Sequence, residues 1–360
     1  MNLKYANKKL IADILSNTNP GRVKIQLNKS ILIQGDNFDV LSSSLDSLSQ
    51  RIDLVYIDPP FNTNSIFTVS KGRASTISKT ADGTVAYFDC MSPEEYLEFL
   101  RCRLVLIREC LSDQGSIYLH IDYKIGHYVK VIMDEVFGRE NFKNDITRIK
   151  SNPKNFFRRA YGNEKDLILF YSKNYKKNIW NDVRIAYSKE ELQEKFPKID
   201  SSGRRYTTVP MHAPGETKGV TGQPWKGIQV PKGRHWRSSP ALFDKMDAEG
   251  NIEWSSTGNP RIKKYADDHK GKKIQDVWTF KDPQYPTYPT EKNHEMIERI
   301  IRQSSSKDSV VMDCFAGSGS TLVVANQLGR KWIGIDSSPV AIKTVSDNLK
   351  NTDYFFLDLS

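Results

Sequence analysis

The stretch SVVMDCFAGSGSTLVVANQLGRKWIGID, residues 309–336, contains the pattern that decides the fold. Its first apolar run ends at Asp313 and predicts a buried strand, and a glycine-rich turn follows. Residues 321–328 predict a helix that Gly329 ends, and residues 331–336 predict a second strand that ends in an acid. This order is typical of a nucleotide-type site, where glycines permit a tight turn and the acid binds ribose hydroxyls.

The spacing of the glycines narrows the choice of cofactor. Gly317 and Gly319 form Gly-x-Gly without the third glycine of a dinucleotide site, and no Gly-Lys-Ser/Thr of a phosphate-binding loop is present. A cofactor with a ribose but no pyrophosphate fits this turn better. We therefore predict S-adenosylmethionine.

A second motif, Asp58-Pro59-Pro60-Phe61, lies far upstream, directly after the apolar run 52–57. That run predicts a buried strand, so Asp58 would lie at its carboxyl end, where ligands bind in open α/β sheets. The prolines fix φ and donate no hydrogen bonds, which gives a stiff turn with free carbonyls. Asp58 and the Pro59 carbonyl could hold an amino group while Phe61 covers a flipped-out base. The alternative is a proline pair that only ends the strand.

Three segments of the chain resemble motifs of the DNA amino-methyltransferases. Residues 58–61 resemble the catalytic motif, residues 313–320 the cofactor motif, and residues 288–292 (Tyr-Pro-Thr-Glu-Lys) the segment before the cofactor motif. The catalytic motif comes first, as in the permuted β group, which includes modification subunits of type III restriction systems. The chain departs from the pattern at Phe61, where many relatives have Tyr, and at Asn293, where many have Pro.

The resemblance implies an α/β fold with a doubly wound, mostly parallel, Rossmann-like methyltransferase sheet that is circularly permuted. In the unpermuted order, residues 309–313, 331–336, 31–36 and 52–57 would be strands one to four. Strands one and four are neighbours at the topological switch point of such a sheet. The glycine-rich turn and Asp58 would then meet in one crevice, as methyl transfer between two bound molecules requires.

The chain is predicted to contain one catalytic domain interrupted by an insertion. Residues 1–180 would form its first half and residues 284–360 its second half. Residues 181–283 are poor in periodicity and match the place of an inserted target-recognition domain. Within them, the arginines of residues 231–237 could contact a guanine edge or phosphate. Alternatively, these arginines are solvated and the insertion has its own small core, formed by Trp225, Trp236, Trp254 and Trp278.

The charge of the chain suggests a nucleic-acid partner. The 360 residues carry a formal net charge of +10, which favours an acidic ligand. Residues 151–161 interleave basic and aromatic side chains, a pattern that suits unstacked bases and phosphate, although a solvated loop is the alternative. Residues 62–86 are rich in Ser, Thr and Gly, which predicts a linker or a segment that closes over the target base.

No apolar run reaches a membrane span, and the four cysteines show no metal-site spacing. We expect a cytoplasmic protein with no metal.

The resemblance also assigns roles to single residues. The catalytic set is Asp58, Pro59, Pro60 and Phe61. The cofactor set comprises Asp336 at the ribose hydroxyls, Asp36 at the adenine end, Thr290 and Lys292 over the methionine carboxylate, and Asp313, Phe315, Gly317 and Gly319 along the methionine half. For each acid the alternative is ordinary strand-end capping.

By resemblance, an Asp at the first position of the catalytic motif favours adenine N6, whereas Ser is typical of cytosine N4 enzymes. We predict site-specific methylation of adenine in double-stranded DNA, after the base has flipped out of the duplex. A cytosine N4 or RNA substrate, and a DNA-binding module that has lost catalysis, remain alternatives. A homodimer and a separate restriction subunit are open by the same analogy.

Overall fold

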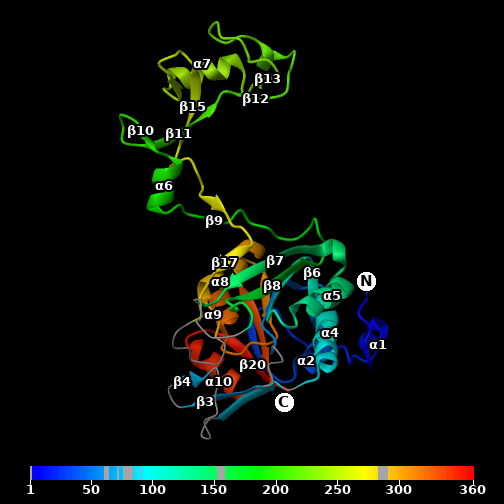
Figure 1. The fold of residues 1–360 in the computed structure, drawn as a ribbon. Helices are drawn as coiled ribbons and strands as arrows, with labels where there is room; N and C mark the ends of the chain where they lie inside the picture. The colour runs from blue at the N-terminus through cyan, green and yellow to red at the C-terminus, as the bar shows by residue number, and fades with distance from the viewer. Residues whose placement is uncertain are drawn as a thin grey trace. The chain divides into compact units, whose positions relative to one another are not determined.

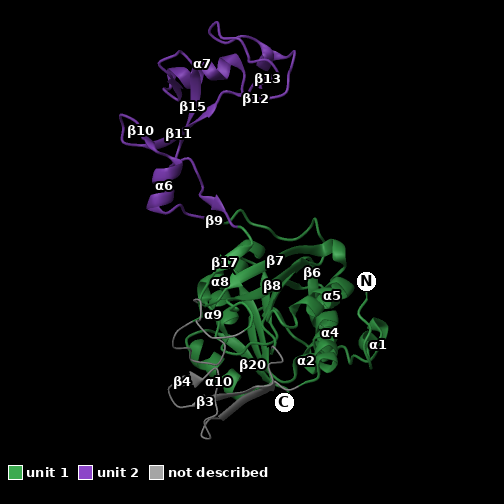
Figure 2. Ribbon diagram, viewed as in Figure 1, with its two compact units in different colours: residues 1–183, 275–360 green, residues 184–274 purple. Residues whose placement is uncertain are grey.

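The computed structural model describes residues 2–60, 91–151, 159–282 and 291–360, together with the backbone of three strands between residues 65 and 89. The chain divides into two compact units (Figure 2). Unit 1 comprises Met1–Val183 and Gln275–Ser360, and unit 2 comprises Arg184–Ile274. The predicted insertion, residues 181–283, includes more residues than unit 2. Its last part belongs to unit 1, because Val277–Thr279 pairs with the main sheet there.

In the described part of the chain, nine strands form the central sheet of unit 1 (Figure 1). In sheet order they are β17 (Val277–Thr279), β7 (Phe142–Ile149), β8 (Lys165–Ser172), β6 (Leu111–Ile121), β2 (Ile52–Ile57), β18 (Val310–Asp313), β19 (Lys331–Asp336), β1 (Ser30–Gln34) and β20 (Tyr354–Asp358).

The direction and order of these strands confirm the predicted permuted α/β fold. From β20 to β6 all neighbours are parallel, whereas β8 is antiparallel to both β6 and β7. The central pair joins β18 to β2, with Val311 opposite Leu54 and Met312 opposite Val55. Predicted strands one and four are therefore neighbours, although more than two hundred residues separate them in sequence.

Helices cover both faces of this sheet (Figure 1). One group packs on the face that buries Ile57, Ile117 and Leu169. The other group packs on the face that buries Tyr56, Tyr118 and Phe170. The first group contains α1 (Ile11–Ser16), α2 (Asn37–Ser43), α3 (Leu45–Leu48), α4 (Pro93–Cys110) and α5 (Gly126–Phe137), and the second contains α8 (His294–Ser304), α9 (Ser320–Gln327) and α10 (Pro339–Asn348).

Local sequence signals explain where the longer helices begin and end. Ser92 and Glu95 form a reciprocal capping box at α4, in which each side chain accepts from the other residue's backbone N–H at 3.2 and 2.9 Å. Helix α5 ends at Gly138, whose φ of +90° suits glycine. A short 3-10 turn, η1 (Arg139–Asn141), then leads into β7.

Between β2 and α4, three strands form a separate antiparallel sheet in the order β4-β3-β5. Their bounds are Ser65–Ser70 for β3, Arg73–Ser75 for β4 and Thr84–Asp89 for β5. The sequence predicts a linker or closing segment for most of this stretch, so the strands were missed. The reason is that Ser, Thr and Gly dominate the composition and hide the alternation that identifies a strand.

Unit 2 is built from short elements around a small core. Met211, Trp225, Trp236, Phe243, Ile252 and Ile262 form that core. Trp254 is 41% exposed and stacks on Trp225 with ring centroids 5.5 Å apart, while Trp278 belongs to β17 of unit 1. Two of the four tryptophans proposed as an insertion core therefore occupy it.

The secondary structure of unit 2 includes a four-stranded sheet in the order β10-β11-β15-β14 and the two-stranded pairs β12-β13 and β16-β9. The elements are β9 (Arg184–Ile185), α6 (Lys189–Lys195), β10 (Lys198–Ile199), β11 (Arg205–Pro210), β12 (His212–Pro214), η2 (Val220–Gly222), β13 (Arg234–Trp236), α7 (Pro240–Ala248), β14 (Ile252–Trp254), β15 (Pro260–Tyr265) and β16 (Lys272–Lys273). Among the described residues of the whole chain, none of the helices has the length and apolarity to cross a membrane.

Candidate active site

The predicted catalytic and cofactor motifs meet at the carboxyl ends of three adjacent strands. Asp58 follows β2, Asp313 ends β18 and Asp336 ends β19. Parallel pairing of β2 with β18 and of β18 with β19 brings these acids to one edge of the sheet. Pro59 is buried and Pro60 is partly buried, whereas Phe61 and Thr290 lie outside the described residues.

Asp58 contacts two groups that come from distant parts of the sequence. Its Oδ2 lies 2.5 Å from Nζ of Lys292, a buried residue just before α8. Its Oδ1 lies 3.3 Å from Nδ1 of His120, at the end of β6. The structure therefore brings the predicted residues Asp58 and Lys292 together directly.

Asp336 holds the glycine-rich turn in place. Its Oδ2 accepts a hydrogen bond from the Gly317 backbone N–H at 2.9 Å, and its Oδ1 accepts one from the Ser338 N–H at 2.9 Å. Because a carboxylate offers about four lone-pair sites, acceptor capacity remains for ribose hydroxyls. Strand-end capping and a ribose contact are thus compatible for Asp336.

Gly319 has a conformation and a position that favour glycine. Its φ is +78°, in the left-handed region, and it precedes the first residue of α9. A Cβ added here would lie 2.9 Å from Cγ2 of Val345 on α10.

Asp313 is a buried acid whose environment disfavours its charge. The residue is only 3% exposed, and its Oδ1 accepts from the Phe315 N–H at 3.0 Å. Burial, together with the nearby charges of Asp58 and Asp336, raises the pKa of Asp313 to about 7, although hydrogen bonds from Thr321 and Phe315 oppose this change. Burial also raises the pKa of Asp336. A cation bound beside these acids would favour their ionised form.

Asp36 acts as a helix cap in this structure. Its Oδ1 accepts from the Phe38 and Asp39 N–H groups at 2.8 and 3.2 Å, and its Oδ2 pairs with Arg103 at 2.8 Å. It also lies on a cavity of about 760 Å³ whose wall includes Phe38, Phe99 and Arg103. The Arg103 guanidinium lies 3.6 Å above the centre of the Phe99 ring, and Phe99 in turn contacts Phe315 edge-on.

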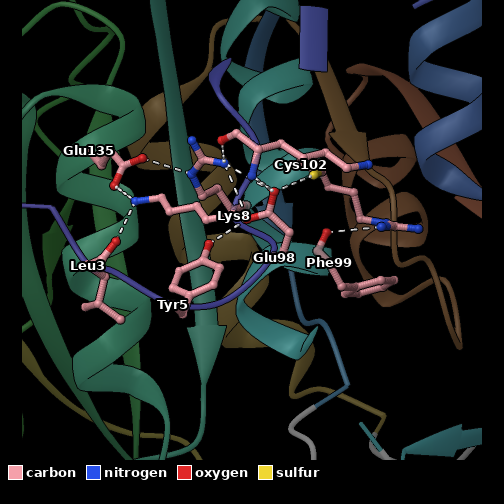
Figure 3. A network of polar contacts seen from close by, with 10 residues as sticks. Leu3, Tyr5, Lys8, Glu98, Phe99, Cys102 and Glu135 are labelled. Carbon is pink, nitrogen blue, oxygen red and sulfur yellow. Dashed lines mark hydrogen bonds and ion pairs between the residues drawn. The ribbon is translucent and has the colours of Figure 1, made fainter. Parts of the chain in front are cut away.

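The N-terminal segment also lines this cavity, through residues that include Lys4, Tyr5 and Lys9, and Figure 3 shows the polar contacts that hold the segment. Nζ of Lys8 lies 2.5 Å from Oε2 of Glu135 and donates to the Leu3 carbonyl at 2.7 Å. The Tyr5 hydroxyl donates to Oε2 of Glu98 at 2.6 Å. Because Glu98 is on α4 and Glu135 on α5, these bonds fasten the segment to both helices.

Sequence reasoning missed a buried polar network behind Asp58. His120 is fully buried, and its Nε2 lies 3.3 Å from Oδ2 of Asp166 on β8. Oδ1 of Asp166 binds Nζ of Lys150 at 2.6 Å. The fully buried Arg148 on β7 has its NH1 atom 3.8 Å from Oδ2 of the same Asp166. The available signal was a histidine and an aspartate placed inside otherwise apolar strands.

The acids at this edge suit the methionine half of S-adenosylmethionine. That half carries two positive charges, an ammonium and a sulfonium, beside its carboxylate, and Asp313 lies at this edge with Asp336 on the next strand. Burial and the neighbouring acids raise the pKa of Asp313, so a positive charge bound beside it would favour its ionised form. When bound, the cofactor would supply an activated methyl group, and the protein would supply position and charge.

Comparison with known proteins gives the family of the chain. Residues 52–347 match the family described as DNA methylase. The chain is 44% identical over 302 residues to the type II methyltransferase M.EcaI of Enterobacter cloacae. This alignment covers 82% of this chain and 64% of that protein. It is 24% identical over 379 residues to the Mod subunit of the type III restriction-modification enzyme EcoP15I of Escherichia coli, which covers 84% and 57% respectively. The chain thus spans between half and two thirds of these relatives.

Two solved structures resemble the chain at low sequence identity. The crystal structure of an M1.HpyAVI–SAM complex is 17% identical, with a TM-score of 0.46, and the match covers 89% of this chain and 100% of that one. PvuII DNA methyltransferase, described as cytosine-N4-specific, is 15% identical with a TM-score of 0.46, covering 95% and 98%. The family match includes both the Asp58 motif and the glycine-rich turn. The chain therefore belongs to the DNA methylase family, whose enzymes depend on S-adenosylmethionine.

Proposed function

We propose that this protein is a DNA methyltransferase of the restriction-modification type, which transfers the methyl group of S-adenosylmethionine to the N6 amino group of adenine in double-stranded DNA. The observation that carries the proposal is the contact between Asp58 Oδ2 and Lys292 Nζ at 2.5 Å, beside the glycine-rich turn. Two motifs more than two hundred residues apart thereby form one site. Family membership supports the reaction class.

The proposed chemistry follows from the weakness of the nucleophile. The lone pair of an exocyclic amino nitrogen is delocalised into the base, so the nitrogen attacks poorly. Asp58 and the Pro59 carbonyl accept hydrogen bonds from its two N–H groups, which favours tetrahedral geometry and frees the lone pair. The Asp58 carboxylate also stabilises the positive charge that develops on nitrogen, a preorganised effect worth roughly 3–4 kcal/mol.

Cofactor binding in this proposal uses the described edge of the sheet. Asp336 accepts from the ribose hydroxyls with the lone pairs that Gly317 and Ser338 leave free. Asp313, Phe315, Gly317 and Gly319 line the methionine half, and the cavity beside Asp36 receives the adenine end. Thr290 and Phe61 keep their predicted roles, over the methionine carboxylate and the target base.

Adenine is the proposed acceptor because the catalytic motif begins with Asp and because type III Mod subunits are among the relatives. Those relatives are named as subunits of restriction-modification enzymes, so we propose a restriction subunit as a partner of this chain as well. A homodimer remains open by the same analogy.

The test is incubation of the purified protein with unmethylated duplex DNA and S-adenosylmethionine, followed by digestion and mass spectrometry of the nucleosides. We expect N6-methyladenine. N4-methylcytosine would keep the reaction class and replace the acceptor. The absence of any methylated nucleoside on DNA of varied sequence would contradict the proposal, and methylation of RNA alone would move it to another substrate.

Unit 2 is the proposed target-recognition domain. Arg234 and Arg237, at and just after β13, are exposed, and NH1 of Arg234 lies 3.2 Å from Nδ1 of His212 on β12. Burial and then the charges of Arg234 and Arg237 lower the pKa of His212, as expected where cations gather. This pair of strands therefore offers a compact cationic surface for DNA.

Replacing Arg234 with alanine should weaken binding to cognate duplex about tenfold, because one contact to phosphate or to a guanine edge is lost. Lys245→Ala is the matched control, since Lys245 is an exposed cation on α7 whose ammonium lies 3.8 Å from Glu249. Fluorescence anisotropy at fixed salt measures both. Equal affinities of Arg234→Ala and the wild type would remove this surface from the interface.

A further inference from the structure

The buried network behind Asp58 contains two acceptor atoms that face each other. Asp58 Oδ1 lies 3.3 Å from His120 Nδ1, it is inaccessible to solvent, and it accepts no hydrogen bond from the described residues. A buried carboxylate oxygen without a donor costs free energy, about 1–3 kcal/mol or more for a charged group. Such an atom in an active site calls for a functional explanation.

The other contacts of the imidazole define where its proton lies. Oδ2 of Asp166 faces Nε2 of His120 at 3.3 Å. Burial alone would raise the pKa of Asp166, but the hydrogen bond from His120 and the ammonium of Lys150 lower it below its ordinary value. Asp166 is therefore an anion that accepts, and Nε2 of His120 carries the proton that it donates.

The opposite nitrogen of the ring is then an acceptor. The Tyr56 hydroxyl lies 3.1 Å from Nδ1 of His120 and can donate to it. Burial lowers the pKa of His120, while the charges of Asp58 and Asp166 oppose this and that of Lys292 adds to it. A neutral imidazole follows, with its Nδ1 lone pair directed at the Asp58–Tyr56 side. His120 Nδ1 and Asp58 Oδ1 therefore face each other as two acceptors, and one proton between them would form a hydrogen bond.

The reaction proposed above releases one proton. As the amino nitrogen forms its bond to the methyl carbon, the carbon–sulfur bond breaks and its electron pair stays on sulfur. The methylated nitrogen then has four bonds and a positive charge. It must lose one hydrogen as a proton, and the electrons of that N–H bond stay on nitrogen. Asp58 is the acid anion nearest to that hydrogen in the proposed geometry.

We propose that Asp58 and His120 together take up this proton. The Asp58 carboxyl group receives it first. After a half-turn about the Cβ–Cγ bond of Asp58, the proton is shared between Asp58 Oδ1 and His120 Nδ1. The inference rests on the proposed function. His120 becomes an imidazolium held between two carboxylates, with Asp166 stabilising its charge and Lys150 and Arg148 balancing Asp166. The proton leaves through Asp58, which is 15% exposed, when the product departs. His120 thus acts through Asp58 and does not touch the base.

The decisive variant is His120→Asn, which keeps a polar group in the pocket but has no basic nitrogen. We expect its single-turnover rate of methyl transfer to fall about 10²-fold at neutral pH, as for loss of a general base. The Kd for cofactor and the KM for DNA should stay within about twofold, since neither ligand touches His120. Tyr118→Phe is the matched control: Tyr118 is buried two residues earlier on β6 and bonds Ser304 at 2.7 Å, outside this network.

The dependence of the rate on pH separates proton uptake from simple packing. In the wild type, the rate should fall on the acid side as His120 becomes protonated before the reaction begins, and His120→Asn should lack this limb. Tyr56→Phe, which keeps the ring and removes a donor to Nδ1, should move the limb to higher pH because neutral His120 loses a hydrogen bond. The Tyr56→Phe variant also tests the proposal if His120→Asn fails to fold.

The outcomes are distinct. No methylation by the wild type would defeat the proposed function itself. An active wild type with an equally fast His120→Asn variant, or with an acid limb that Tyr56→Phe leaves in place, would overturn the inference while the function stands. A loss in His120→Asn confined to kcat, together with a shifted limb in Tyr56→Phe, supports it.

Discussion

Replacing Asp58 with alanine should reduce methyl transfer at least about 10³-fold, because the variant loses both the acceptor of an amino hydrogen and the charge that stabilises the transition state. Cofactor affinity should change by no more than about threefold, since the turn that contains Gly317 is held by Asp336 and not by Asp58. Single-turnover transfer of labelled methyl groups to duplex DNA measures the first quantity, and calorimetric titration with cofactor measures the second.

Asp53→Asn provides the control on the same strand. Asp53 lies near the start of β2, where its carboxylate binds the Ser112 hydroxyl at 2.9 Å and the Val310 N–H at 3.0 Å, far from the carboxyl end of the strand. This variant should keep its activity. Asp58→Asn should behave like Asp58→Ala, because an amide is a poorer acceptor and leaves the buried Lys292 without its anion. Turnover of Asp58→Ala at the wild-type rate would exclude Asp58 from catalysis.

Cofactor binding should weaken by roughly tenfold for each pH unit below about 7, because protonation of Asp313 removes an anion from the methionine half of the site. Between pH 8 and pH 5 the loss should approach 10²-fold. Asp313→Asn should bind weakly at every pH and show a nearly flat profile. Equilibrium titrations with cofactor in buffers of constant ionic strength give both curves; a wild-type curve as flat as that of Asp313→Asn would remove Asp313 from the site.

The same pKa makes a prediction about stability without cofactor. The folded pKa of Asp313 is raised above its unfolded value, so the folded state binds more protons between about pH 4 and pH 7. The free energy of unfolding should therefore fall as the pH rises through this window and level off above it. Bound cofactor should oppose the fall, because its positive charges favour the ionised acid.

The fold was predictable where local signals and connectivity agree. Residues 309–336 alternate between a buried strand, a turn that requires positive φ, and a helix, and each of these signals is local. Adjacency of β18 and β2 is a tertiary fact, yet the family resemblance supplied it correctly. The sequence missed β17 as part of the main sheet, because three residues before a Pro-rich stretch give too short a pattern.

The site was predictable to the extent that its residues stand in motifs. Asp58, Lys292, Asp313 and Asp336 do, and the structure brings them to one edge of the sheet. His120 and Asp166 stand in separate strands with no fixed spacing, so only the pairing of β6 with β8 brings them together. Arg148 lies just before the basic and aromatic residues 151–161, but it is buried and paired with Asp166 and Asp282.

The order of the strands also has a consequence for how the chain matures. Strand β2 is complete at Ile57, but its neighbour β18 is synthesised only after about 250 further residues, which takes roughly 10–50 s at ribosomal rates. Strand β1 waits longer still, for β19 and β20. During that interval both edges of β1, and the edge of β2 that faces β18, lack their native partners, and such unpaired edges invite aggregation. Slower translation or higher temperature should therefore lower the soluble yield of this protein, and chaperones that bind extended apolar segments should restore it.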